Sequence, residues 1–149
     1  MLLSMTRLRE ELEVERPIED VFDLVGDFAN TKDWDPGVEE SEKITDGPIG
    51  VGTRYRVVAV FGGRRLPIEY RVTGWDPPRR VTLEGLGSTF RGIDAIGFEP
   101  TSSGGTRITY EADLRLRGPL RLVEPLMRRR FEQTGADAIL GMRRALART

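Results

Sequence analysis

Residues 14–38 read VERPIEDVFDLVGDFANTKDWDPGV, and this segment decides the fold because an extended stretch runs directly into a short amphipathic helix. Pro17 suits the first helical turn, since its φ is preset and it has no N–H to lose. Glu19 and Asp20 then place negative charge where a helix N-terminus favours it. The apolar side chains recur at helical spacing and form one stripe, made of Ile18, Val21, Phe22 and Val25. We therefore predict a short helix that packs this stripe against a core.

A second short helix is expected directly after the first. Gly26 and Asp27 interrupt the chain and cap a new helical start, and the helix continues to about Trp34. Residues 35–37 read DPG, which is a turn sequence. The Trp34 side chain is therefore predicted to lie at a corner between two elements.

Alternation of apolar and polar residues predicts strands on both sides of this segment. The first strand has an apolar face of Leu8, Leu12 and Val14 opposite an acidic face. The pair Gly62-Gly63 supplies the positive φ values of a two-residue hairpin turn, and the charged strand before that hairpin is expected at a sheet edge. The expected strands are residues 8–16, 38–44, 53–61, 64–75, 81–85, 90–99 and 107–117.

Residues 120–147 predict one long C-terminal helix. Pro125 is the only residue in them that would break a helix, and it is tolerated in the first turn or delays the helix start. Small residues on the apolar side leave space beside the helix: Thr134, Gly135, Ala138 and Gly141. A helix of about 25 residues spans roughly 37 Å, which is enough to cross a small sheet. Strongly curved antiparallel strands around one long helix satisfy both patterns.

The composition excludes several kinds of chemistry. The 149 residues contain no Cys and no His, which removes disulfides, thiolate catalysis, a Ser–His–Asp triad and metal sites built on Cys or His. Any reaction must therefore use carboxylates, tyrosines, arginines or water, and we expect no cofactor and no metal. The formal net charge of −1 argues against a nucleic-acid partner.

The length and the first residues give two further expectations. A chain of 149 residues corresponds to one domain, and it is long enough to bury a full core. Residues 1–5 have neither the positive flank nor the long apolar run of a signal peptide. We therefore expect a cytoplasmic protein without an integral membrane segment.

Four segments, taken in order, carry a family resemblance. They are residues 14–38, residues 50–53 (GVGT) at the start of a strand, residues 76–79 (DPPR) in a turn, and residues 98–106, in which FEP precedes Gly105-Thr106. Together they resemble the START-like (SRPBCC) superfamily of polyketide cyclase/dehydrase-like proteins. The resemblance runs from about Leu8 to Leu146.

The resemblance implies a fold and a cavity. The fold is the α+β helix-grip, in which a curved antiparallel sheet of about six or seven strands wraps around a long C-terminal helix. Two short helices follow the first strand. Residues 1–149 would then form a single START-like ligand-binding domain, with an internal cavity between the sheet and the C-terminal helix.

Aromatic residues are the first candidates for the lining of this cavity. Tyr55, Tyr70 and Tyr110 lie at strand positions that are expected to face inward, and Trp34 lies at the corner after the second helix. A buried hydroxyl requires a hydrogen-bond partner, which a ligand or a water molecule can supply. The alternative interpretation is that these residues are core aromatics whose polar atoms bond to neighbouring protein groups.

A carboxylate and a guanidinium are the second candidates. Asp94 shares the parity of the apolar positions of its strand, and Arg130 precedes Phe131 on the long helix. As a pair they would orient a ligand carbonyl or hydroxyl. Alternatively, Asp94 lies at the cavity mouth and Arg130 on the solvated helix edge. Glu84 and Asp35 are weaker candidates, because a shift of one residue in register turns them outward.

The complete predicted set has eight ligand-binding residues and assigns no catalytic residue. It consists of Trp34, Tyr55, Tyr70, Asp94, Tyr110, Arg130, Phe131 and Thr134. The glycine-rich residues 47–52 (GPIGVG) are left out as a phosphate site, because phosphate loops use the N–H groups of a helix N-terminus and this loop leads into a strand. In the resembling family this connection lies near the cavity entrance, so the loop is either a gate or a plain turn.

Three functions remain as hypotheses. The leading one is binding of a hydrophobic or aromatic small molecule in the internal cavity, in a pocket on the order of 300–1,000 Å³. The resemblance also implies a polyketide aromatase/cyclase or dehydratase, which would move protons with Tyr, Asp, Arg and water. A lipid or quinone carrier or a protein-interaction module is the third. The sequence does not identify the ligand, the pathway or the oligomeric state, and a dimer is one of the states left open.

Overall fold

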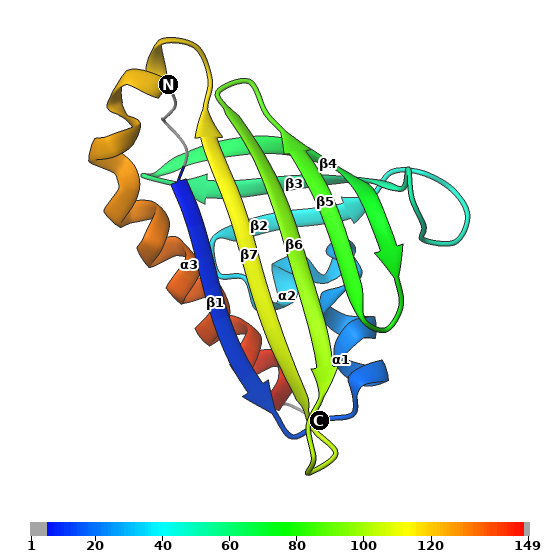
Figure 1. Cartoon of the computed structure of the whole chain (residues 1–149). Coiled ribbons are helices and arrows are strands. Elements are labelled where there is room, and N and C mark those ends of the chain that lie inside the picture. Colours follow the sequence, from blue (N-terminus) through cyan, green and yellow to red (C-terminus); the bar gives the residue numbers. More distant parts are fainter. Residues whose placement is uncertain (1–5, 148–149) are drawn as a thin grey trace.

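Residues 6–147, which the computed structural model describes, contain one seven-stranded antiparallel sheet (Figure 1). The spatial order of the strands is β1-β7-β6-β5-β4-β3-β2. The predicted sheet of six or seven strands is therefore confirmed. The absence of a signal-peptide pattern concerns residues 1–5, which lie outside the described residues. The strands are β1 (Thr6–Val14), β2 (Val38–Lys43), β3 (Arg54–Phe61), β4 (Arg64–Asp76), β5 (Arg80–Leu86), β6 (Phe90–Pro100) and β7 (Thr106–Leu116).

The segment that opens the sequence folds as predicted, with small shifts at its ends. Pro17 is the N-cap of helix α1 (Ile18–Val25) and not its first helical residue. The second helical stretch begins with a 3₁₀ turn, η1 (Phe28–Asn30), and continues as helix α2 (Thr31–Trp34). The carboxylate of Asp27 accepts a hydrogen bond from the Ala29 N–H at 3.0 Å, which caps this second start.

The apolar stripe of α1 docks the helix on the sheet. Val21, Phe22 and Val25 are buried. The centroid of the Phe22 ring lies 5.0 Å from that of Trp75 on β4 and 5.1 Å from that of Phe98 on β6. The rings are tilted or edge-on to each other, which are arrangements that aromatic pairs prefer. These contacts fix α1 across one end of the sheet.

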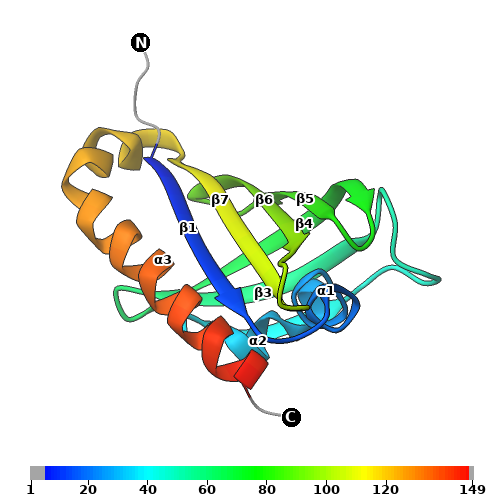
Figure 2. The same cartoon turned by 60° about the horizontal axis from the view of Figure 1, so that its bottom comes forward.

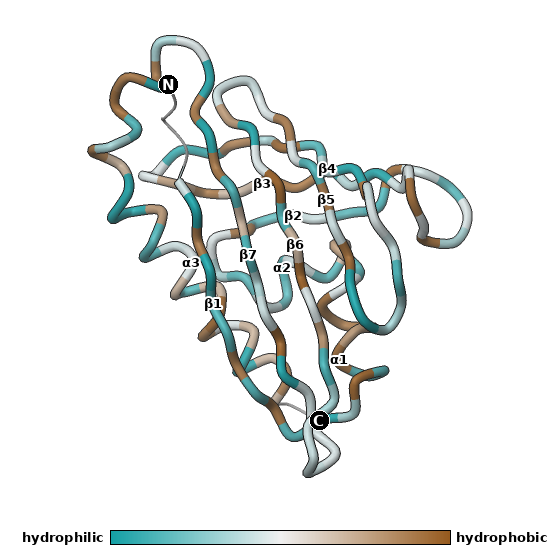
Figure 3. The backbone as a smooth tube through the Cα atoms, in the orientation of Figure 1, coloured by the Kyte–Doolittle hydropathy of each residue, from teal (hydrophilic) through white to brown (hydrophobic). Residues whose placement is uncertain are grey.

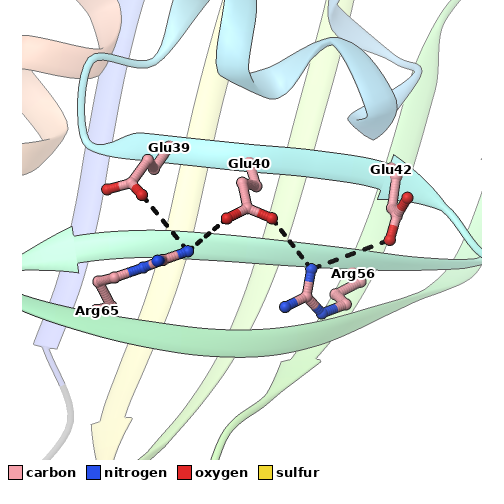
Figure 4. Close-up of polar contacts among 5 residues, drawn as sticks. All are labelled: Glu39, Glu40, Glu42, Arg56 and Arg65. Carbon is pink, nitrogen blue, oxygen red and sulfur yellow. Dashed lines mark hydrogen bonds and ion pairs between the residues drawn. The ribbon is translucent and has the colours of Figure 1, made fainter.

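The edge strand β2 carries charges on its outer face, as the sequence predicts (Figure 4). Arg65 forms ion pairs with Glu39 (3.4 Å) and with Glu40, and Arg56 pairs with Glu40 (3.3 Å) and Glu42 (3.9 Å). The hydrogen bonds from the two guanidinium groups lower the pKa of Glu40. All five side chains are exposed, so the network tethers the edge strand weakly and discourages pairing with another sheet.

The hairpin of β3 and β4 turns at the predicted glycine pair. Gly62 and Gly63 have φ values of +60° and +78°, and Phe61 pairs directly with Arg64. This tight turn fixes the register in which Tyr55 faces Tyr70 across the two strands. Both tyrosines therefore share the face that the alternating pattern assigns to the interior.

The long helix begins a few residues later than its pattern suggests. The segment after β7 forms a 3₁₀ stretch, η2 (Gly118–Val123), and α3 follows as Glu124–Ala147, with Pro125 in its first turn. The side chain of Glu124 is buried, and its carboxylate accepts a hydrogen bond from the Leu116 N–H at 2.7 Å. This bond fastens the start of α3 to the end of β7.

Helix α3 runs along the sheet edge formed by β1 and meets α2 at its far end (Figures 1 and 2). The closest approach is at Gly141, where an added Cβ would lie 2.0 Å from the carbonyl oxygen of Trp34. Only a glycine therefore fits at this crossing. No helix among the described residues is long and apolar enough to cross a membrane.

The interior is filled by the inward positions of the central strands. The strands alternate hydrophobic and hydrophilic residues along their length, which is visible in Figure 3. Val72, Val81, Leu83, Ile96 and Ile108 are completely buried. Each such side chain contributes roughly 1.5–3 kcal/mol relative to an exposed position. The buried core also includes Ile139, Met142, Ala145 and Leu146 in the C-terminal half of α3.

Candidate functional site

A cavity of about 170 Å³ lies between the sheet and helix α3. Its walls come from β1, β3, β4, β6, β7 and α3, together with residues around α2. Most of the lining is apolar and includes Leu8, Val57, Ile68, Phe90, Leu114 and Ile139. The predicted internal cavity is thus present, and it is smaller than the range of roughly 300–1,000 Å³ usual for ligand pockets. It exceeds the engineered cavity of about 150 Å³ that holds a benzene molecule.

Asp94 and Tyr110 form the polar centre of this cavity. Asp94 lies on the inner face of β6 because it shares the parity of Gly92 and Ile96, and its exposure is only 4%. The Tyr110 hydroxyl, on the adjacent strand β7, donates a hydrogen bond to Oδ2 of Asp94. Burial raises the pKa of Asp94 to about 7, which the hydrogen bond from Tyr110 partly opposes and the nearby charge of Asp35 increases. Asp94 can therefore gain or lose a proton near neutral pH.

Tyr70 adds a second phenol to the cavity from β4. Its exposure is 9%, and its hydroxyl has no hydrogen-bond partner among the described residues. Burial, followed by the charges of Asp94 and Asp35, raises the pKa of Tyr70 well above its usual value. The hydroxyl therefore stays protonated and is free to bond to a molecule in the cavity.

Two further carboxylates line the cavity, and neither belongs to the predicted ligand-binding set. Asp35 follows α2 and accepts a hydrogen bond from the Gly37 N–H at 2.8 Å. Burial raises the pKa of Asp35 to about 6, against the effect of this hydrogen bond, and the charge of Asp137 raises it further. Glu10 lies on β1 directly opposite Tyr110. The parity of Glu10 with Leu8 and Leu12 is the sequence signal that could have identified it.

Three of the predicted residues do not line the cavity. Trp34 is buried behind the wall, where its ring meets that of Tyr110 edge-on at 6.2 Å. Its indole N–H has no hydrogen-bond partner among the described residues. Tyr55 is also buried, 6.2 Å from the ring of Phe28, and burial followed by the charge of Asp27 raises its pKa. Both side chains support the lining from outside.

Arg130 is the third of these residues, and it does not pair with Asp94. Arg130 is exposed, and its Nη1 would lie 3.4 Å from a Cβ placed on Gly62 at the β3–β4 turn. The interpretation of a solvated helix edge thus describes Arg130, whereas Asp94 faces inward. Glu84 lies outside and pairs with Arg71 and Arg91 at 3.6 and 3.3 Å.

Helix α3 contributes the remaining predicted residues to the cavity. Phe131 is buried and stacks on Phe61 with 5.1 Å between ring centroids. Thr134 lines the cavity, and its hydroxyl donates to the Arg130 carbonyl oxygen at 2.9 Å. The glycine-rich residues 47–52 do not contribute to the lining. Within residues 6–147, no group of three carboxylates could hold a metal ion.

Together these features define a helix-grip protein with an apolar internal cavity that contains a small polar cluster. The model of the family described as polyketide cyclase/dehydrase and lipid transport matches residues 5–147, and the chain belongs to this family. No curated protein matches the chain.

Solved structures share the fold at low sequence identity. TTHA0849 from Thermus thermophilus is similar with a TM-score of 0.79 and 23% identity, over 95% of this chain and 97% of that chain. A START superfamily protein from Mycobacterium smegmatis is similar with a TM-score of 0.81 and 14% identity, over the same shares. The Zhui aromatase/cyclase from Streptomyces sp. R1128 is similar with a TM-score of 0.76 and 16% identity, over 95% of this chain and 91% of that chain. These structures confirm the helix-grip fold, and the family match confirms the resemblance to polyketide cyclase/dehydrase-like proteins.

Proposed function

We propose that this protein binds a hydrophobic or aromatic small molecule in the cavity between the sheet and α3. The observation that supports this most strongly is an apolar cavity in which the unpartnered hydroxyl of Tyr70 lies near the buried carboxyl of Asp94. An apolar pocket with a few directing polar groups is the usual form of a small-molecule site. The cavity volume of about 170 Å³ suits a body of one or two rings.

Different lining residues would contact different parts of the ligand. Phe131 and the apolar strand residues would contact the ligand body, and Tyr70, Asp94 and Tyr110 would orient its polar group. Thr134 would contribute its methyl group, since its hydroxyl already bonds to the helix backbone.

Filling the cavity tests this proposal. Ala138 lines the cavity from α3, so Ala138→Phe should occlude it, whereas Leu140→Phe adds an aromatic ring at a half-exposed position of the same helix that does not line the cavity. Binding of naphthalene, followed by NMR shifts of cavity methyl groups, should be lost in the first variant and kept in the second. Native mass spectrometry of freshly purified protein would reveal a retained ligand directly. Naphthalene shifts that are equal in both variants would contradict the site.

A cyclase or dehydratase is the second candidate, and the near-neutral pKa of Asp94 favours it. A base with a pKa of about 7 can remove a proton from a methylene group between two carbonyls. The enolate would add to a ketone carbonyl of the same chain, with a Tyr hydroxyl donating a hydrogen bond to the developing oxyanion. The oxyanion would take back the proton held by Asp94, and loss of the new hydroxyl together with the second methylene proton would release water. One solved structure with this fold is named an aromatase/cyclase, which supports considering this reaction.

The enzyme hypothesis makes its own prediction. Turnover of a poly-β-ketone mimic should follow a pH profile with a midpoint near 7 and should be abolished in Asp94→Asn. Tyr110→Phe should reduce turnover while leaving Asp94 in place. Inertness toward several such mimics would leave only the binding function.

A further inference from the structure

The charged side chains that line the cavity are all acidic. Glu10, Asp35 and Asp94 reach it from β1, from the turn after α2 and from β6, and no lysine or arginine of residues 6–147 belongs to the lining. The other polar side chains of the lining are neutral hydroxyl groups: Tyr70, Tyr110, Thr31, Thr89 and Thr134. A ligand that enters this space therefore meets negative charge without a compensating protein cation.

This arrangement is costly in the empty state. Burial opposes the ionisation of both Asp35 and Asp94, and the charge of Asp35 raises the pKa of Asp94 further. An ionised carboxylate in an apolar site is strongly unfavourable unless a countercharge lies beside it. The hydroxyl of Tyr110 solvates Asp94 from one side only, and a hydroxyl carries no charge.

We propose that the cavity takes an amphiphilic amine, that is, a ligand in which an apolar one- or two-ring body carries a protonated amino group beside Asp94 and Asp35. This rests on the proposed function of the cavity as a binding site. The ammonium group supplies the missing countercharge. The oxygen of the Tyr70 hydroxyl accepts a hydrogen bond from one N–H of the ammonium group. The phenol rings of the lining also attract a cation. A carboxylate ligand would instead add a further negative charge and is excluded.

Amine binding must also displace protons. The groups that act on the amine are Glu10 of β1, Asp35 after α2, Asp94 of β6 and the phenols of β4 and β7, with Asp137 of α3 acting on Asp35. A bound cation favours the ionised carboxylates, so binding at about pH 7 releases protons and binding strengthens between about pH 6 and pH 8. A neutral ligand would show neither effect.

The test uses three naphthalene ligands that share one body and differ in the polar group: 2-(2-naphthyl)ethylamine, 2-(2-naphthyl)ethanol and 2-naphthylacetate. Calorimetry at pH 8 should show that the amine binds at least about tenfold more tightly than the alcohol, and that the acid binds at least about tenfold more weakly than the alcohol. Each tenfold step in affinity corresponds to about 1.4 kcal/mol. Titration at pH 7 in buffers of different ionisation enthalpy should show proton release for the amine only.

Variants separate the charge from the shape of the site. Asp94→Asn and Asp35→Asn should each remove most of the preference for the amine over the alcohol, while Asp23→Asn, at an exposed position of α1, should keep it. Equal affinities for amine and alcohol, or tighter binding of the acid, would overturn this inference and leave the proposed binding function intact. Failure of all three ligands to bind would instead refute the binding function itself, and this inference with it.

Discussion

Replacing Asp94 with asparagine tests how much stability the buried carboxyl costs the protein. The folded state holds the pKa of Asp94 at about 7, against an ordinary value of 3.8, because burial opposes its charge. Between these two values the folded protein binds more protons than the unfolded chain, so stability must fall as pH rises. The contribution of protonated Asp94 is fully present below about pH 4 and is lost as pH rises through about 7.

The size of the effect follows from the shift. Roughly three pKa units at about 1.4 kcal/mol each give a loss of about 4 kcal/mol once Asp94 is fully ionised. Between pH 5 and pH 8.5 the loss is about 2–3 kcal/mol, because the unfolded chain is already largely ionised at pH 5. An asparagine cannot ionise, and its amide oxygen can still accept the hydrogen bond of Tyr110. The Asp94→Asn variant should therefore match the stability of the wild type near pH 5. At pH 8.5 it should be more stable than the wild type by about 2–3 kcal/mol.

Urea unfolding at pH 5 and pH 8.5 measures this difference. Asp23→Asn, at an exposed position, is the matched control and should follow the wild-type profile at both pH values. The pH dependence that remains in Asp94→Asn should include that of Asp35, whose pKa is also raised by burial. If Asp94→Asn lost stability equally at both pH values, Asp94 would be an ordinary ionised side chain and the reasoning would be refuted.

Three further perturbations test the cavity wall and the attachment of α3. Tyr110→Phe removes the hydrogen bond that lowers the pKa of Asp94, so the carboxyl titration followed by NMR should move its midpoint above 7; an unchanged midpoint would contradict the hydrogen bond. Gly141→Ala should destabilise the protein by ~1–3 kcal/mol in thermal unfolding, because the clash with a backbone oxygen outweighs the gain in helix propensity of about 1 kcal/mol. The control is Gly135→Ala, which should be neutral or slightly stabilising because its new methyl group would meet only the flexible side chain of Leu8 at 3.3 Å. Equal effects at both glycines would argue against the close crossing of α3 and α2. Glu124→Ala leaves the partly buried N–H of Leu116 without its acceptor and should cost about 1 kcal/mol or more in urea unfolding, while an unchanged midpoint would contradict that anchor.

Parity along the strands predicted much of the candidate site. Tyr70, Asp94 and Tyr110 face inward because alternate residues of a strand share a face, and the tight glycine turn holds the register. Parity also places Glu10 inward, but an acidic residue among other acidic residues gives no signal of its own until the cavity is known. Asp35 lies in a turn, where no periodicity applies.

Three predicted residues do not line the cavity, because the sequence does not show how deeply a side chain is buried or how far it extends. Trp34 and Tyr55 are buried, as their aromatic character suggests, yet neighbouring side chains separate them from the cavity. Sequence periodicity gives the side of an element and not the layer in which a side chain ends. Arg130 has a long side chain that extends to the β3–β4 turn, where its guanidinium stays in water.

The amino-acid sequence by itself determined the elements and their faces, because propensity, turn chemistry and hydrophobic period act over a few neighbouring residues. Residues 14–38 contain both short helices, and the glycine pair at 62–63 contains its own turn. Only the tertiary structure decided which carboxylates share one cavity. Glu10, Asp35 and Asp94 lie far apart along the chain and meet because a curved sheet brings β1, β6 and the end of α2 around the same space. The raised pKa values of Asp35 and Asp94 arise from burial in this space, which no single segment contains.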